Sequence, residues 1–269
     1  MTTVTSIRSA DATLPVSIVG EGQTLIFFNG LGSTQAMWKR VVAQLKGRYR
    51  VVTFDFRGHG RATSTNDYSF NAFLSDAAAI IKGVGVDRPI IVGWSLGADL
   101  AVWYAAAHPG TPAGIVVVDG AVPIPGRLVL DPVKTRRLLN SPLMKVALFV
   151  WRLTPYGYRL SSDQITDVTL EVDERRQQLL EVYDKINCPV SMVLAERSAK
   201  RGPDAERMNK LWRAGAERLA RKYPALPIHW LNTTHLLPFR KPAELAKVID
   251  DIYAGLAEPV RSGNPASSN

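Results

Sequence analysis

A serine between two glycines is the feature of this sequence that most clearly indicates chemistry. The segment Gly93-Trp94-Ser95-Leu96-Gly97 follows an apolar run at 89–92 and precedes a stretch with helical periodicity. Glycines two residues either side of a serine let the chain turn sharply from strand to helix, which exposes the hydroxyl at the end of the strand. A serine hydroxyl is a weak nucleophile until a base takes its proton. The pattern therefore predicts Ser95 as a nucleophile that needs a partner from elsewhere in the chain.

Four histidines are available as that base, at positions 59, 108, 229 and 235. His235 lies between the last predicted strand and the last predicted helix, in a loop from which a side chain can reach back over Ser95. His229 lies inside the strand, where a half-buried histidine with a structural role is the simpler interpretation. His59 occupies a tight turn and His108 ends a helix. We therefore expect His235 to be the base.

The elements that must position these residues follow from the hydrophobic pattern. Short apolar runs bounded by turn residues predict strands, and longer runs with helical periodicity predict helices. The predicted strands are 4–8, 16–19, 24–28, 50–54, 89–92, 114–118, 189–194 and 227–231. The predicted helices are 36–46, 70–84, 96–108, 205–223 and 242–256. Strands that alternate with helices predict an α/β fold, with a mostly parallel sheet wrapped by helices.

One long segment interrupts the alternation. Residues 123–187 contain helical stretches with bulky apolar side chains and no convincing strand. We expect an inserted helical lid, or cap, on a core formed by residues 1–122 and 188–257. The alternative is that these are ordinary outer helices of a larger sheet. Residues 258–269 are rich in Pro, Gly, Ser and Asn and are predicted to form a disordered tail.

The order of these pieces resembles that of the α/β-hydrolase family, over nearly the whole chain up to the tail. The matching segments are 28–32, the Asp55-Phe56-Arg57-Gly58-His59-Gly60 turn, the Ser95 turn, the helical insert and the His235 loop. The resemblance implies an eight-stranded sheet flanked by helices, and an oxyanion hole made by the backbone N–H groups of Leu31 and Leu96. Many members have His where this chain has Asn29. Because the donors are backbone groups, we expect the hole to tolerate that difference.

The acid that should orient the histidine is the least regular part of the resemblance. Such an acid accepts a hydrogen bond from the second ring nitrogen and so holds the tautomer. Many members place it after the strand predicted at 189–194, but that slot holds Ser198 here. We expect Asp119, which follows the preceding strand, to be the acid; Glu196 is the alternative, and an absent acid is the third possibility. Asp204 is more remote and is expected to cap the next helix.

The resemblance implies a serine hydrolase that cleaves an ester, thioester or lactone through an acyl-enzyme on Ser95. Branches of the family with an aspartate nucleophile are excluded in their usual form. Apolar residues of the lid favour an apolar small-molecule substrate, and Trp94 is expected to line the pocket, although simple packing is an equal interpretation for most of these residues. Two alternatives remain open: carbon–carbon hydrolysis, lyase or cyclase chemistry on the same residues, and a ligand-binding protein without turnover.

Composition limits the remaining classes of function. The 269 residues carry a net charge of +9, but the basic residues are spread along the chain without a nucleic-acid-binding motif, so we expect no nucleic-acid partner. The N-terminus lacks the apolar run of a signal peptide, and the densest apolar stretch, 146–151, is too short to span a bilayer, which predicts a cytoplasmic protein. Cys188 is the single cysteine and is expected to be inert. No metal or cofactor motif is present, and the oligomeric state is left open.

Overall fold

Eight strands form one sheet in a computed structural model that describes residues 2–199 and 204–257. The strands are β1 (Thr2–Ser9), β2 (Ala12–Val19), β3 (Thr24–Phe28), β4 (Arg50–Phe54), β5 (Ile90–Trp94), β6 (Gly114–Val118), β7 (Val190–Ala195) and β8 (Ile228–Leu231). Their order across the sheet is β1-β2-β4-β3-β5-β6-β7-β8. Strands β3 to β8 are parallel to their neighbours in this group, and β2 is antiparallel to both β1 and β4. The α/β fold and the mostly parallel eight-stranded sheet predicted from the sequence are confirmed.

The central strands are buried on both faces, which explains why they are continuous apolar runs. In β3, Ile26 and Phe28 pack into one hydrophobic core, whereas Leu25 and Phe27 pack into the other. This alternation is the two-residue period of a strand. Helices must therefore cover both sides of the sheet.

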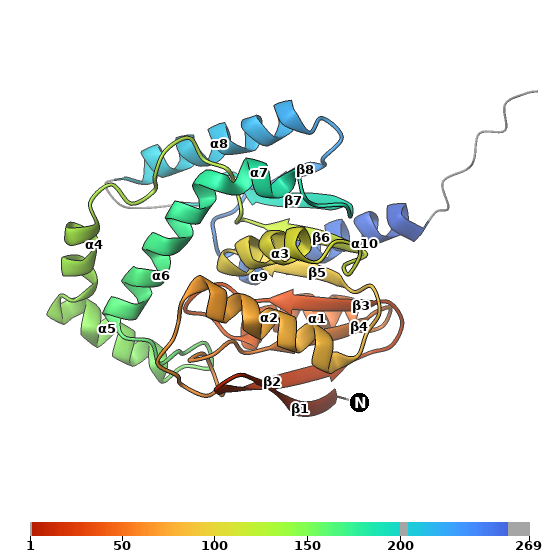
Figure 1. Cartoon of the computed structure of the whole chain (residues 1–269), viewed down its shortest axis with the longest axis horizontal. Coiled ribbons are helices and arrows are strands. Elements are labelled where there is room, and N and C mark those ends of the chain that lie inside the picture. Colours follow the sequence, from red (N-terminus) through yellow and green to blue (C-terminus); the bar gives the residue numbers. More distant parts are fainter. Residues whose placement is uncertain (1, 200–203, 258–269) are drawn as a thin grey trace, which may run out of the picture.

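Most of the helices cover the two faces of the sheet, whereas α4 and α5 lie at one end of the molecule (Figure 1). Their bounds are α1 (Lys39–Leu45), α2 (Phe70–Val84), α3 (Leu96–Ala107), α4 (Pro132–Leu139), α5 (Pro142–Arg152), α6 (Ser162–Arg175), α7 (Leu179–Tyr183), α8 (Ala205–Lys222), α9 (Leu237–Arg240) and α10 (Pro242–Ala257). Buried side chains of α2, α3, α6, α7 and α8 belong to the first core, and those of α1, α9 and α10 belong to the second.

The structure corrects several predicted element ends. Strand β5 continues to Trp94, directly before Ser95, and the leading hairpin is longer than predicted. The helix predicted at 36–46 begins as a 3₁₀ turn at Gln35–Trp38, and the short α9 was not predicted. Asp204 is the N-cap residue of α8 as expected, but its side chain makes no capping hydrogen bond.

Residues 123–187 are helical, with no strand in this fully described range apart from an isolated bridge between His59 and Tyr158. The segment has two parts. Helices α6 and α7 bury apolar side chains such as Val168 and Leu179, whereas α4 and α5 bury none. The division into core and cap stays a prediction, and the predicted tail at 258–269 lies outside the described residues.

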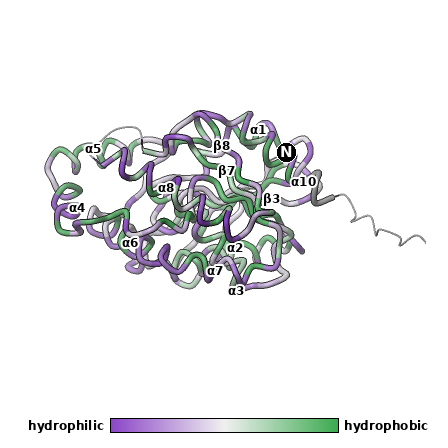
Figure 2. Tube along the Cα trace, turned by 90° about the horizontal axis from the view of Figure 1, so that it is seen from above, coloured by the Kyte–Doolittle hydropathy of each residue, from purple (hydrophilic) through white to green (hydrophobic). Residues whose placement is uncertain are grey.

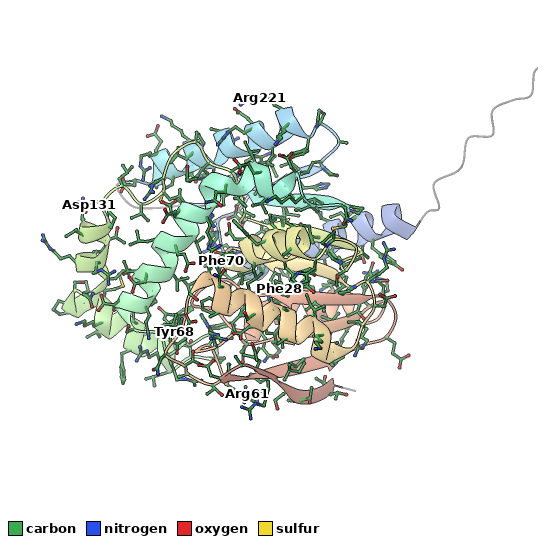
Figure 3. All side chains as sticks on the ribbon, viewed as in Figure 1. Phe28, Arg61, Tyr68, Phe70, Asp131 and Arg221 are labelled. Atoms are coloured by element: carbon green, nitrogen blue, oxygen red, sulfur yellow. The ribbon has the colours of Figure 1, made fainter. Side chains whose placement is uncertain are left out.

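Polar and charged side chains lie mostly on the outside. Figure 3 shows Arg221 on the outer side of α8 and Asp131 beside α4, while Phe28 lies inside the molecule. No helix in the described part of the chain combines the length and apolar character needed to cross a membrane.

Candidate active site

The predicted chemical residues gather at the carboxyl edge of the parallel strands. Leu31 follows β3, Ser95 follows β5, Asp119 follows β6 and His235 follows β8. Carboxyl ends of parallel strands meet at one edge of a sheet, so residues far apart in sequence become neighbours there.

Ser95 occupies a strained backbone position between β5 and α3. Its φ of 56° and ψ of −122° lie outside the regions that non-glycine residues usually adopt. Other backbone atoms lie very close to this turn, so the flanking positions hold glycine, which has no Cβ. A Cβ on Gly93 would lie 2.2 Å from the carbonyl oxygen of Gly97, and a Cβ on Gly97 would lie 2.3 Å from that of Phe28.

A hydrogen-bonded chain joins the three predicted residues. The Ser95 Oγ lies 3.0 Å from His235 Nε2, and His235 Nδ1 lies 2.7 Å from Asp119 Oδ2. With Nδ1 donating to the carboxylate, Nε2 is free to accept the proton of Ser95. A histidine held in this way is able to take the proton of a serine hydroxyl as the oxygen attacks a carbonyl.

The Asp119 carboxylate is fully buried and accepts four hydrogen bonds. Oδ2 accepts from His235 and from the Ser198 hydroxyl at 2.8 Å. Oδ1 accepts from the backbone N–H of Ala195 at 3.1 Å and from Trp212 Nε1 at 3.0 Å. A buried carboxylate needs such partners because it has lost its water. The bonds also fix the orientation of the side chain.

The alternatives for the acid lie elsewhere in the structure. Among the described hydrogen bonds, none joins the Glu196 carboxylate to His235, and Glu196 contributes its backbone N–H to the Leu231 carbonyl. Ser198, in the slot where many members carry the acid, lies 3.4 Å from His235 Nδ1 and donates to Asp119 instead. Sequence reasoning noted Ser198 only as a departure and missed Trp212, for which no sequence signal is evident.

Leu31 and Leu96 face a common space beside Ser95. Neither of their backbone N–H groups donates to another protein group among the described residues. The turn that carries Leu31 is held by Asn29, whose side chain donates to the Phe54 carbonyl at 2.5 Å and accepts from Trp38 Nε1 at 2.8 Å. Asn29 is therefore a buried anchor for this turn.

His59 holds the same turn from the other side. Its Nε2 accepts from the backbone N–H of Gly32 at 2.9 Å, so its Nδ1 donates to the Arg57 carbonyl at 2.8 Å. The ring is almost completely buried, and burial lowers the pKa of His59 to about 4. His59 is therefore a neutral structural histidine at physiological pH.

Two small cavities meet at Ser95, Leu128 and Arg176. The first has a volume of about 250 Å³ and is also lined by Ser198, Ala199, Met208, Trp212 and His235. The second has a volume of about 140 Å³ and is also lined by Leu31, Leu96, Val129, Thr169, Val172 and Asp173. Trp94 lines neither of them, and its place in the substrate pocket stays a prediction. It is buried in the opposite core, where its indole donates to the His235 carbonyl at 2.9 Å.

Arg176 is a pocket residue that sequence reasoning missed. Its Nε and Nη2 donate to the two oxygens of Asp99, at 3.0 and 2.6 Å, and Nη1 makes no hydrogen bond among the described residues. The guanidinium also lies 5.3 Å from the centre of the Trp212 ring. Asp99 was the available signal, because a carboxylate inside the apolar segment 96–107 indicates a buried cation.

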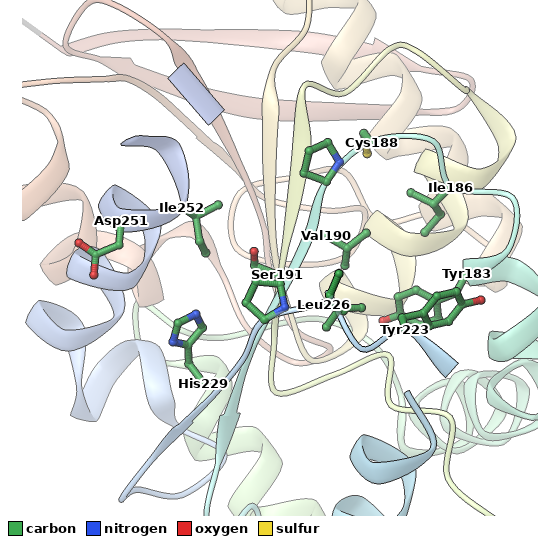
Figure 4. Close-up of a pocket in the computed structure, with 13 residues that line it drawn as sticks. Tyr183, Ile186, Cys188, Val190, Ser191, Tyr223, Leu226, His229, Asp251 and Ile252 are labelled. Atoms are coloured by element: carbon green, nitrogen blue, oxygen red, sulfur yellow. The ribbon is translucent and has the colours of Figure 1, made fainter. Parts of the chain in front are cut away.

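A larger cavity of about 590 Å³ lies at the other edge of the sheet, at the amino ends of β7 and β8. Figure 4 shows it between His229 and Asp251 on one side and the two tyrosines Tyr183 and Tyr223 on the other. Cys188 borders it, and burial raises the pKa of that thiol to about 11, so it is protonated at neutral pH. Among the described residues, no group of His, Cys, Asp and Glu side chains is suited to hold a metal ion.

Comparison with known proteins gives the same fold. A model of the alpha/beta hydrolase family matches residues 25–248. The chain is 32% identical over 108 residues to 2-(acetamidomethylene)succinate hydrolase of Mesorhizobium japonicum, over 40% of this chain and 39% of that protein. It is 32% identical over 114 residues to 3-oxoadipate enol-lactonase 1 of Acinetobacter baylyi, over 42% of this chain and 43% of that protein. The chain thus matches about two fifths of the length of these relatives.

Solved structures match over nearly the whole chain. The crystal structure of E-2-(acetamidomethylene)succinate hydrolase has a TM-score of 0.69 at 21% identity, covering 94% of this chain and 100% of that one. An esterase from Exiguobacterium antarcticum has a TM-score of 0.74 at 14% identity, covering 94% of this chain and 100% of that one. At these identities the likeness establishes the fold.

Proposed function

The chain belongs to the alpha/beta hydrolase family, and from this premise we propose that it is a serine hydrolase that cleaves a small ester, thioester or lactone. Ser95 is the nucleophile, His235 the general base and Asp119 the acid that orients the histidine. The observation that carries the proposal is the unbroken chain from Ser95 Oγ to His235 Nε2 at 3.0 Å and from His235 Nδ1 to Asp119 Oδ2 at 2.7 Å.

The reaction runs in two halves. His235 Nε2 takes the Ser95 proton as the oxygen attacks the substrate carbonyl, and the N–H groups of Leu31 and Leu96 donate to the oxyanion that forms. His235 then protonates the leaving oxygen or sulfur as its bond to the carbonyl carbon breaks, which leaves an acyl group on Ser95. The leaving group departs from an ester or thioester, whereas it stays attached to the acyl chain when the substrate is a lactone. A water molecule activated by His235 attacks this ester and releases the acid and the free serine. Asp119 stabilises the imidazolium in both halves.

The two cavities limit the substrate. Their volumes of about 250 and 140 Å³ suit small groups on either side of the reacting carbonyl. The larger one contains His235 and is assigned to the leaving group, because that group must receive a proton from Nε2. Most of the surface that lines both cavities is apolar, and Arg176, whose Nη1 has no hydrogen-bond partner among the described residues, borders both of them. A mainly apolar substrate with one acceptor near the reacting carbonyl fits this lining.

A fluorophosphonate probe tests the nucleophile, because such probes react with activated serines. We expect one adduct per chain by intact mass, which disappears in Ser95→Ala and persists in Ser75→Ala, an exposed serine on α2. Absence of an adduct in the wild-type protein, or labelling that survives in Ser95→Ala, would contradict the proposal.

Turnover by this variant and the incorporation of water into the product separate ester hydrolysis from a binding protein and from lyase or cyclase chemistry, and the bond that is missing from the product identifies carbon–carbon hydrolysis. Turnover of short-chain esters and lactones should be lost in Ser95→Ala, whereas a binding protein without turnover would show none in either form. Lyase or cyclase chemistry would leave a product without the added water, which mass spectrometry in ¹⁸O-labelled water distinguishes.

A further inference from the structure

The end of the molecule formed by α4 and α5 exposes an unusual number of large apolar side chains. We call residues 130–153 the α4–α5 tip. Three of its exposed apolar residues come from the α4 region: Leu130, Val133 and Leu138. Six come from α5 and the residue after it: five on one side of the helix, Leu143, Val146, Phe149, Val150 and Leu153, and Trp151 on another side, which is 38% exposed. Large apolar side chains exposed in such number on two neighbouring helices are typical of an interaction site.

The exposed residues of α5 form one face of the helix. Leu143, Val146, Val150 and Leu153 recur every three or four residues, which places them on one side. Met144, Leu148 and Trp151 lie on another side of the helix. Met144 and Leu148 are half-buried, and Trp151 is 38% exposed. The inner side is tied to the site, since Trp151 Nε1 donates to the Gly32 carbonyl at 3.2 Å. The outer face has no partner among the described residues.

Basic residues accompany this apolar face. The tip contains Lys134, Arg136, Arg137, Lys145 and Arg152 against a single acid, Asp131. Arg136 is paired with Asp163 and Asp167 of α6. The other four basic side chains form no salt bridge among the described residues. The tip therefore presents apolar side chains together with uncompensated positive charge.

We propose that the α4–α5 tip binds an anionic lipid surface, with the outer face of α5 inserted at the boundary between headgroups and acyl chains. Apolar insertion and attraction of Lys and Arg to anionic headgroups act together in helices that lie on membranes. A second copy of the chain fits this surface less well, because pairing two such tips would bring their unpaired basic residues together.

The position of the tip suits this role. Figures 1 and 2 show α4 and α5 at one end of the molecule, with α10 at the opposite end. Docking through the tip would place the Trp151 contact, and hence the turn that carries Leu31, next to the lipid surface. The proposal concerns binding alone, so it can fail while the proposed hydrolase activity stands, and the reverse also holds.

Vesicle sedimentation with the full chain tests the proposal. We expect the protein to sediment with phosphatidylglycerol-containing phosphatidylcholine vesicles, and less as salt rises from about 0.1 M to about 0.5 M. Val146→Asp should lower partitioning about tenfold because a charge replaces an inserted side chain. Val4→Asp is the matched control, since Val4 is 60% exposed and Val146 62%. Lys134→Gln with Arg137→Gln should weaken binding, whereas Arg221→Gln on α8 should not.

Three results would overturn the proposal. The wild-type protein fails to sediment with anionic vesicles, or Val146→Asp and Val4→Asp weaken sedimentation equally. In the third, the wild-type protein binds no vesicles but self-associates in analytical ultracentrifugation, and Val146→Asp abolishes that self-association. This result would assign the tip to a second copy of the chain. Circular dichroism spectra and melting curves confirm that each variant is folded.

Discussion

Among the single residues of the candidate site, Asp119 stands out because four hydrogen bonds hold its carboxylate in place. Its four donors come from β7, from the loop after β7, from α8 and from His235. Ser198 donates to the same oxygen as His235, so a neutral hydroxyl occupies the slot where many relatives carry the acid. In the proposed mechanism the site therefore uses one carboxylate, with Ser198 as a positioning residue.

The first prediction separates the candidate acids. Asp119→Asn should lower kcat by about 10³–10⁴-fold, because an amide cannot hold the tautomer that leaves His235 Nε2 free to accept. Ser198→Ala removes one bond to the carboxylate and should have a much smaller effect, and Glu196→Gln should have none. Steady-state kinetics on one ester substrate measures all three. Full activity in Asp119→Asn would refute the assignment.

The second prediction concerns His59 and the dependence of stability on pH. Because burial lowers the pKa of His59 from 6.5 to about 4, the folded protein keeps this ring neutral where the unfolded chain binds a proton. The free energy of unfolding should therefore fall as the pH drops from about 6.5 to about 4, by ~3 kcal/mol. Urea unfolding at several pH values measures it. His59→Gln should flatten this dependence and the exposed His108→Gln should not; an unchanged slope in His59→Gln would contradict the prediction.

At the scale of elements, the strand–turn–helix unit around Ser95 depends on close approach of backbones. Gly97 lies against the end of β3, and Gly93 lies against Gly97. This contact sets where α3 begins, and therefore where Ser95 stands relative to His235.

The third prediction tests that contact. Gly97→Ala places a methyl group 2.3 Å from the Phe28 carbonyl oxygen and should destabilise the protein by about 2 kcal/mol or more. Gly47→Ala is the control, since a Cβ there meets nothing within 4 Å, and it should change stability by less than about 1 kcal/mol. Urea denaturation compares the two. Equal effects would mean that the crowding at Gly97 is relieved by small shifts.

In the molecule as a whole, the end of α5 and the segment after it connect the helical insert to the core loops. Trp151 donates to the Gly32 carbonyl, Thr34 donates to the Pro155 carbonyl, and Gly60 donates to the Gly157 carbonyl. These hydrogen bonds connect the insert directly to the turn that carries Leu31 and to its neighbours.

The fourth prediction measures this connection. Trp151→Phe removes one hydrogen bond worth about 1 kcal/mol, so kcat/KM should fall about fivefold. The melting temperature should change little, because the side chain is partly exposed and α5 buries no residue. A large fall in melting temperature with unchanged kcat/KM would show that the contact is only structural.

Local patterns predicted most of the fold. Apolar runs and helical periods depend on neighbouring residues, so the strands and helices of the core were identified, with errors mainly at their ends. The Gly93–Gly97 pattern predicted the turn at Ser95 because its steric requirement is local. The position of His235 followed from element order, since a loop after the last parallel strand must lie at the carboxyl edge.

Periodicity, glycine spacing and element order can be read along the chain. They were therefore enough to predict the α/β architecture and the positions of Ser95 and His235 at the carboxyl edge of the sheet. Which side chains come into contact at the edge of the sheet could be read only from the folded structure. Asp119 and Ser198 follow adjacent strands and end at the same edge, and their geometry alone shows that the carboxylate of Asp119 faces His235. Trp94 packs in the second core, with α1, α9 and α10. Arg176 lies beside the pocket because it pairs with Asp99. Long-range packing sets these outcomes, because the direction of a side chain depends on neighbours that are distant in sequence.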